Sequence, residues 1–122
     1  MNIKMPNYDF HNCFSPREFE EFVQDVLEIK EQVPFEISGR GKDGGIDLRY
    51  WEGKTKIIVQ VKCYQNNYRQ LLSVLRSQEK QKAMVLNPSR YILVVSFTLE
   101  LRQKDEIYQL FEGIIKNRED II

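Results

Sequence analysis

The stretch Gly39 to Gln65, GRGKDGGIDLRYWEGKTKIIVQVKCYQ, decides the fold and raises the question of function. Apolar and polar side chains alternate over residues 46–50, and residues 56–63 are rich in β-branched residues. A turn signal with Gly53 separates the two runs, so together they predict a β-hairpin. Gly44 and Gly45 precede it and predict a tight loop, whose small residues would also let a phosphate backbone approach closely.

Polar side chains fall on one face of this predicted hairpin. Because side chains alternate along a strand, Gln60 and Lys62 project together, and pairing of the strands brings Asp47 across from them. A carboxylate and an amide oxygen, with a main-chain carbonyl such as that of Val61, are suitable hard ligands for Mg²⁺. Lysine cannot be a ligand while it is charged. It can instead orient or help deprotonate a metal-bound water, and it can offset charge that develops on a phosphate. The pattern therefore predicts a metal site for phosphate chemistry.

The flanking sequence predicts helices and two further strands. Ser15 to Glu18 forms a capping box, with Pro16 suited to the first helical position. The expected elements are a helix from Pro16 to about Lys30, a short strand at 35–37 ended by Gly39 and Gly41, a helix from Tyr68 to about Ala83, a buried strand at 91–95 and a last helix from Leu101 to Lys116. The order αβββαβα predicts an α/β fold with a central mixed sheet and helices on both faces.

Composition bounds the class of protein. The 122 residues make one domain, and 42% hydrophobic with 30% charged residues is ordinary globular composition. The formal net charge is zero, which argues against bulk electrostatic coating of nucleic acid but leaves room for a local basic patch. No apolar run is long enough to span a membrane. Cys13 and Cys63 lack metal or disulfide spacing, so we expect a reducing, cytoplasmic location.

The chain resembles the PD-(D/E)xK nuclease superfamily, and most closely its Mrr-like restriction endonuclease branch. The resemblance lies in Asp47, a spacer of twelve residues, Gln60-Val61-Lys62 and a preceding helix that carries Phe19-Glu20. It implies a restriction-endonuclease-like αβββαβ core and a Mg²⁺-dependent endonuclease, with Mn²⁺ as a substitute. Within the branch, residues 8–10, 15–20 and 88–93 resemble the N-terminal nuclease effector of bacterial antiviral STAND NTPases. That implies one Mrr-like nuclease domain, residues 1–122, taken from a larger protein of anti-phage defence.

The resemblance also implies a role for each matched residue. Asp47 is then the central metal ligand, Lys62 the catalytic lysine, and Glu20 the helix glutamate that supports the metal site. Gln60 stands where many members of the superfamily have Asp or Glu. An amide is the weaker ligand, although glutamine is usual in the Mrr-like branch. Two alternatives stay open: Glu21 in place of Glu20, and Asp43 in place of Asp47.

Basic side chains offer contacts to DNA. Arg69, Arg76 and Lys80 fall on one side of the second predicted helix, and Arg40 and Lys42 lie in the glycine-rich loop. These residues can meet phosphates, but a solvated helix face explains the helical ones equally well. The neighbouring Tyr64, Asn66 and Asn67 can touch the substrate, although an asparagine that starts a helix is the plainer account.

Two classes of function follow. The first is an endonuclease acting on double-stranded DNA with little sequence specificity, because no helix-turn-helix or zinc-finger signature supplies base readout. Cutting both strands needs two sites, so a homodimer or higher oligomer is expected. We expect no membrane among its partners. The second is a catalytically inactive nucleic-acid-binding or oligomerisation module. The apolar stripe of residues 101–115 serves either the core or a dimer face.

Overall fold

The computed structural model describes residues 16–40, 46–63 and 67–122, which form one sheet covered by helices. The elements are α2 (Pro16–Glu31), β1 (Glu36–Arg40), β2 (Ile46–Glu52), β3 (Thr55–Lys62), α3 (Tyr68–Val74), the π-helical turn η1 (Leu75–Glu79), α4 (Lys80–Leu86), β4 (Arg90–Val95), α5 (Leu101–Leu110) and the 3₁₀ turn η2 (Arg118–Asp120). The α3, η1 and α4 segments follow one another without a break. This order confirms the predicted α/β class and its αβββαβ core.

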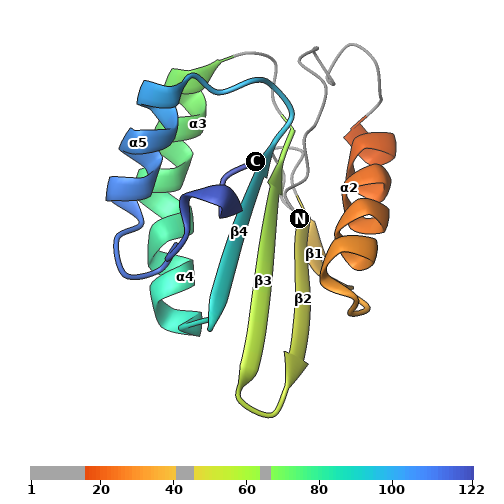
Figure 1. Ribbon diagram of the computed structural model, residues 1–122. Helices are drawn as coiled ribbons and strands as arrows, with labels where there is room; N and C mark the ends of the chain where they lie inside the picture. Colours follow the sequence, from red (N-terminus) through yellow and green to blue (C-terminus); the bar gives the residue numbers. More distant parts are fainter. Residues whose placement is uncertain (1–15, 41–45, 64–66) are drawn as a thin grey trace.

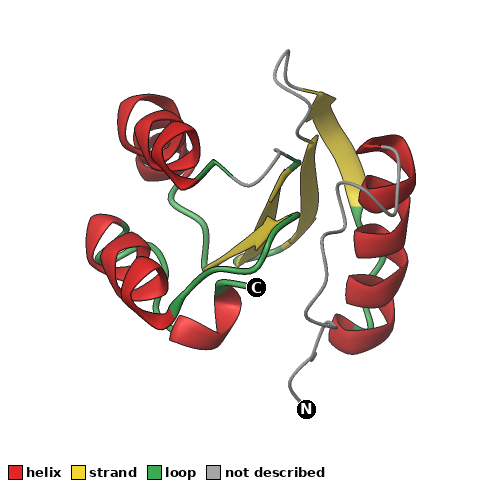
Figure 2. Ribbon diagram, turned by 90° about the horizontal axis from the view of Figure 1, so that it is seen from above, coloured by secondary structure: helices red, strands yellow, loops and turns green. Residues whose placement is uncertain are grey.

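The sheet is mixed, with strand order β1-β2-β3-β4. The first two pairs are antiparallel, and β3 pairs in parallel with β4 through the α3–η1–α4 crossover. Gly53, with φ of +58°, sits in the left-handed region at the β2–β3 turn, where glycine is favoured. Figures 1 and 2 show α2 on one face of the sheet and the α3–α4 helix with α5 on the other. The predicted cover on both faces is therefore confirmed.

The first core lies between α2 and the sheet. Apolar residues of α2 recur every four positions and are fully buried, so they form one stripe along the helix. They pack against the strand residues whose side chains point to the same side. The principal contributors are Phe19, Val23, Leu27, Leu48, Val59, Val61, Ile92 and Val94.

The second core lies on the opposite face, under the α3–α4 helix and α5. Its strand contributions come from the alternate positions, which include Ile58, Leu93 and Val95. Tyr91 stacks on Phe111 with ring centroids 5.3 Å apart. β3 and β4 are thus buried on both sides, as expected for the parallel part of a mixed sheet.

Two predicted boundaries were wrong. Gly39 does not end the first strand, because β1 continues to Arg40 across an irregularity in register between Ile37 and Gly39. The last helix ends at Leu110 and not at Lys116. Gly113, with φ of +84°, turns the chain in the left-handed region, and Ile115 still reaches the core without a continuous helix.

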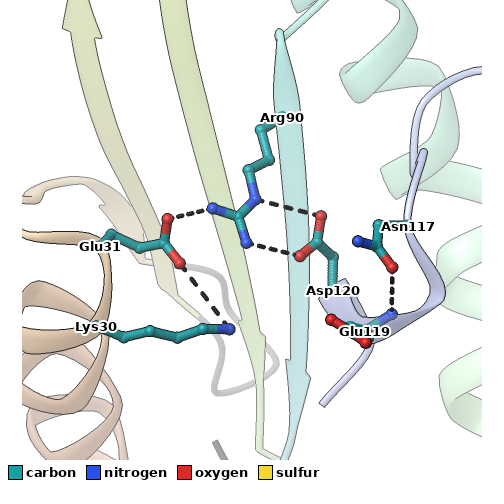
Figure 3. A network of polar contacts seen from close by, with 6 residues as sticks. All are labelled: Lys30, Glu31, Arg90, Asn117, Glu119 and Asp120. Carbon is teal, nitrogen blue, oxygen red and sulfur yellow. Dashed lines mark hydrogen bonds and ion pairs between the residues drawn. The ribbon is translucent and has the colours of Figure 1, made fainter. Parts of the chain in front are cut away.

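An ion-pair network ties three distant segments together. Arg90 at the start of β4 donates to Asp120 of η2 through Nη2 at 2.8 Å and Nε at 3.3 Å. The same guanidinium pairs with Glu31 at the end of α2 (Figure 3). Ile122 continues this attachment, since its amide donates to Leu93 and its carbonyl accepts from Val95. Residues 120–122 are therefore held against β4 by hydrogen bonds and an ion pair.

The predicted capping residue Ser15, together with His11 and Cys13, lies outside the described residues. Cys63 follows directly after β3 and is buried, as is usual for a free cysteine. Of the helices that the structure describes, none has both the length and the apolar character needed to cross a membrane.

Candidate active site

The hairpin brings the predicted polar residues together. Asp47 of β2 lies directly opposite Gln60 of β3 in the antiparallel register, and Lys62 follows Gln60 on the same side of β3. This face belongs to the second core, because Ile58 is in the same alternation and packs beneath the α3–α4 helix. The predicted convergence of an acid, an amide and an ammonium on one sheet face is therefore observed.

Burial distinguishes these residues from ordinary surface polar groups. Gln60 is 5% exposed and Lys62 only 2%, whereas Asp47 is half-buried. Lysine is almost never fully buried unless its charge is paired. The site consequently needs a nearby carboxylate, and the hairpin pattern predicts none on this face besides Asp47.

Glu79 is the functional candidate that sequence reasoning missed. Its carboxylate lies over the sheet at the end of η1, with Oε1 3.3 Å from Nζ of Lys62, and the side chain is 4% exposed. Nζ of the more exposed Lys82 lies 3.6 Å from the same oxygen. Glu79 therefore forms a buried ion pair with the predicted catalytic lysine and a second, solvent-facing pair with Lys82.

The π turn explains why a glutamate at this position faces the sheet. The buried residues of the continuous helix are Leu71, Leu75, Glu79 and Ala83, each four positions after the last. Four residues of an α-helix advance by about 400°, so such a series drifts around the helix by about 40° at each step. A π turn holds more residues per turn and reduces the drift. The four-residue spacing from Leu71 and Leu75 is the sequence signal that could have found Glu79, although it leads to the sheet only because of the π turn.

Asp47 lies in an environment that disfavours its charge. Burial raises the pKa of its carboxyl group, and the neighbouring Glu79 carboxylate raises it further. Lys82, Lys62 and Arg49 act in the opposite direction without cancelling these effects. A carboxylate held close to a second carboxylate in a partly desolvated site is a suitable place for a cation.

The donor set fits a hard divalent cation. Asp47 and Gln60 provide side-chain oxygens from adjacent strands, and the main chain of Val61 lies next along β3, between Gln60 and Lys62, while its side chain is buried on the α2 side. Mg²⁺ uses one or two carboxylates and fills its remaining positions with water and substrate phosphate. Over the described parts of the chain, no three or more His, Cys, Asp or Glu residues gather as metal ligands. A bound cation would therefore be held by the carboxylate of Asp47, the amide oxygen of Gln60 and the main-chain carbonyl of Val61.

The two candidate helix glutamates differ in burial. Glu20 is 4% exposed, whereas Glu21 is exposed and lies 3.8 Å from Arg17 on the outer side of α2. Figure 1 shows that α2 begins at the end of the sheet where β2 begins and β3 ends. Burial distinguishes Glu20 from Glu21, but α2 covers the face of the sheet opposite to the one that carries Asp47. The role of Glu20 at a metal site stays a prediction. Asp43, the alternative to Asp47, lies outside the described residues.

The residues that we predicted to contact DNA do not line the cavity beside Asp47 where the structure describes their side chains. Arg69 and Arg76 are exposed on the helix, and neither lines the cavity beside Asp47. Arg40 is the last residue of β1, and Lys42 lies outside the described residues. The basic residues that do line the cavity are Arg49 and Lys82.

Asn67 has the plainer of its two expected roles. Its side-chain oxygen accepts a hydrogen bond from the amide of Gln70 at 3.1 Å, which caps the start of α3. Tyr64 and Asn66 lie outside the described residues.

The fold and these side chains define a class: an αβββαβ domain of the restriction-endonuclease type, with an acid and a Gln-x-Lys on neighbouring strands. The family model Mrr_cat, described as restriction endonuclease, matches residues 12–92, and the chain belongs to this family. Membership indicates a nuclease.

One curated relative is an uncharacterized protein, y4cD, of Sinorhizobium fredii (strain NBRC 101917 / NGR234). It is 33% identical over 104 residues, which are 84% of this chain and 16% of the relative. The chain therefore spans about a sixth of the length of the curated relative it matches. No solved structure matches the chain.

Proposed function

We propose that this chain is a Mg²⁺-dependent endonuclease that hydrolyses phosphodiesters of double-stranded DNA with little sequence specificity. The observation that carries the proposal is the convergence of Asp47, Gln60 and Lys62 on one buried sheet face in a chain of the Mrr_cat family. Mn²⁺ is the expected substitute for Mg²⁺, since both cations accept oxygen ligands.

Each residue has a distinct task in this proposal. Asp47, Gln60 and the carbonyl of Val61 would hold the cation, with Glu20 as support from α2. The bound cation supplies positive charge at the phosphate and favours ionisation of water. Lys62 offsets negative charge as it develops on the phosphate, and Glu79 fixes the position of its ammonium.

The basic residues around the site indicate which side chains would contact the DNA backbone. Arg49 and Lys82 line the cavity beside Asp47, so they can contact the phosphates closest to the cut. Arg40, Lys42, Arg69 and Arg76 remain proposed as more distant contacts. Contacts of this kind position the backbone and carry no base readout, which agrees with low sequence specificity.

The proposal extends to the larger protein. Cutting both strands requires two sites, so we infer a homodimer or higher oligomer that forms through the parent protein. The resemblance to effectors of antiviral STAND NTPases supports a cytoplasmic role in anti-phage defence. The relative's greater length is compatible with such an arrangement, since the matched part is 16% of it.

The test is cleavage of supercoiled plasmid by the chain alone and by a fused dimer, with Mg²⁺, with Mn²⁺ and with chelator. We expect cleavage to require the metal. We also expect the amount of linear product to increase when the chain is dimerised. The double variant Lys62→Met/Glu79→Leu removes the buried pair together and should be inactive while remaining folded. Cleavage by this folded variant at the wild-type rate would contradict the role of Lys62. DNA binding without cleavage under any of these conditions would favour the inactive binding module.

A further inference from the structure

A cavity of about 610 Å³ opens between the sheet and the α3–α4 helix, beside the candidate active site. Asp47 and Gln60 form part of its wall, so any group inside it lies next to the phosphate that those residues would face. Its size is within the range of pockets that hold small organic molecules. A backbone phosphate alone leaves most of this space unfilled.

The lining of the cavity favours an uncharged, partly apolar group. The walls include the apolar side chains of Ile58, Ala83, Val85 and Leu86, which approach from both the sheet and α4. The charged groups that line it are two acids, Asp47 and Glu79, and two bases, Arg49 and Lys82. The two bases can contact a phosphate beside Asp47, but the lining as a whole has no excess of positive charge that would fill the cavity with phosphate.

One buried hydroxyl in the wall is not satisfied. Tyr91 is 2% exposed, and its hydroxyl has no hydrogen-bond partner among the residues that the structure describes. Its ring is fixed by stacking on Phe111. Burial raises the pKa of the phenol well above its usual value, and the nearby Glu79 and Asp47 raise it further, so the group keeps its proton. A buried donor without a partner beside a cavity is suited to a ligand that carries an acceptor.

We propose that this cavity receives a nucleobase of the DNA strand, turned out of its stack next to the phosphate to be cut. A base has apolar faces for the aliphatic walls and a polar edge for hydrogen bonds. The buried Tyr91 lines the cavity as a donor, and Gln60, Gln78 and Gln81 line it as amides that can donate or accept. The proposal rests on the proposed function, because it assigns part of the nuclease substrate to the cavity.

This assignment makes a distinctive prediction about substrate preference. Turning a base out of a duplex requires loss of pairing and stacking, and an unpaired or mismatched base loses least. DNA with a mismatch at the occupied position should therefore bind more tightly than a fully paired duplex. The enzyme would then cut DNA with little sequence preference and yet favour helical defects.

The experiment uses duplex DNA that carries 2-aminopurine, a base whose fluorescence rises when it leaves the stack. Binding is followed without Mg²⁺ by this fluorescence and by the polarisation of a backbone dye. Two neighbouring exposed residues of α4 give matched variants: Val85→Phe narrows the cavity, whereas Met84→Phe adds the same ring at a position that does not line it. Tyr91→Phe removes only the buried hydroxyl.

The expected result is a fluorescence rise with wild type and with Met84→Phe, and none with Val85→Phe. The affinity measured by polarisation should fall roughly tenfold for Val85→Phe, as for loss of one bound base. For Tyr91→Phe, the affinity should fall by about two- to tenfold, the worth of one hydrogen bond. An equal rise with both α4 variants, or no rise at all, would overturn the base pocket.

Plasmid cleavage by the same proteins separates this proposal from the proposed function. Cleavage without a base signal overturns the pocket and leaves the nuclease in place. A base signal that Val85→Phe removes, without cleavage by wild type, keeps the pocket and overturns the nuclease. Absence of both binding and cleavage overturns both. If a second copy fills the cavity instead, Val85→Phe alters the oligomeric mass and no base signal appears, which also overturns the proposal.

Discussion

The ammonium of Lys62 and the carboxylate of Glu79 form a buried ion pair, 3.3 Å apart, that joins the centre of the sheet to the π turn of the covering helix. Both side chains are less than 5% exposed, so each charge depends on the other. The pair brings the predicted catalytic lysine and a second acid to the same face as Asp47 and Gln60. It therefore links the stability of the fold to the chemistry of the site.

The first prediction concerns the stability of this pair. Lys62→Met leaves Glu79 buried with the more exposed Lys82 as its remaining ion-pair partner among the described residues, and should lower the free energy of unfolding by about 3–5 kcal/mol. Lys62→Met/Glu79→Leu removes both charges. Its free energy of unfolding should be close to that of wild type, because an apolar pair of similar volume avoids the desolvation penalty. Urea denaturation of both variants measures the difference. A double variant as unstable as the single one would show that the charges are not coupled.

The second prediction concerns the pH dependence of stability. Because the folded state raises the pKa of Asp47, it holds that proton to a higher pH than the unfolded chain does. The contribution of Asp47 to stability therefore falls as pH rises through the folded pKa, and ionised Asp47 is unfavourable at neutral pH. Asp47→Asn should raise Tm by a few degrees at pH 7, and this advantage should shrink below the unfolded pKa. Thermal unfolding across pH checks it.

Asp25→Asn is the matched control for this prediction, because Asp25 is exposed on α2 and away from the hairpin. Its Tm should follow that of wild type at each pH. If Asp47→Asn and Asp25→Asn behave alike, the partial burial of Asp47 has no energetic effect.

The third prediction concerns metal binding in the absence of DNA. If Asp47 holds the cation, Mg²⁺ should stabilise wild type by about 1.4 kcal/mol at ten times its Kd. Asp47→Asn should show no stabilisation over the same range, since its amide lacks the carboxylate charge. Thermal unfolding against Mg²⁺ concentration measures both. Equal stabilisation of the two proteins would place the cation elsewhere.

The fourth prediction separates structural ion pairs from the site. Arg90 connects the start of β4 with Asp120 and Glu31 (Figure 3). Lys62 pairs with Val95 at the other end of β4, far along the strand direction. Arg90→Met should lower the free energy of unfolding by about 1–2 kcal/mol, since the guanidinium is one-third exposed. The cleavage rate of the folded fraction should not change. A loss of activity without a loss of stability would assign Arg90 to the site.

Short-range patterns account for the parts of the fold and site that the sequence predicted. Strand alternation and the Gly53 turn are local, so the pairing of Asp47 with Gln60 followed from counting residues. Glu79 depended instead on a wider π turn and on a helix crossing back over the sheet, and neither is a local property. The end of α5 was missed for a similar reason, because Ile115 keeps its core position after the helix has turned at Gly113.

Plasmid cleavage by a variant of Asp47 decides whether the sheet face that carries this residue hydrolyses DNA. Supercoiled plasmid is incubated with Mg²⁺ and wild type, Asp47→Asn or Asp25→Asn, each shown by circular dichroism to be folded. The account predicts nicking and linearisation by wild type and Asp25→Asn, and a rate for Asp47→Asn lower by about a hundredfold or more, the usual effect of removing a group that stabilises transition-state charge. Cleavage by Asp47→Asn at the wild-type rate would contradict it.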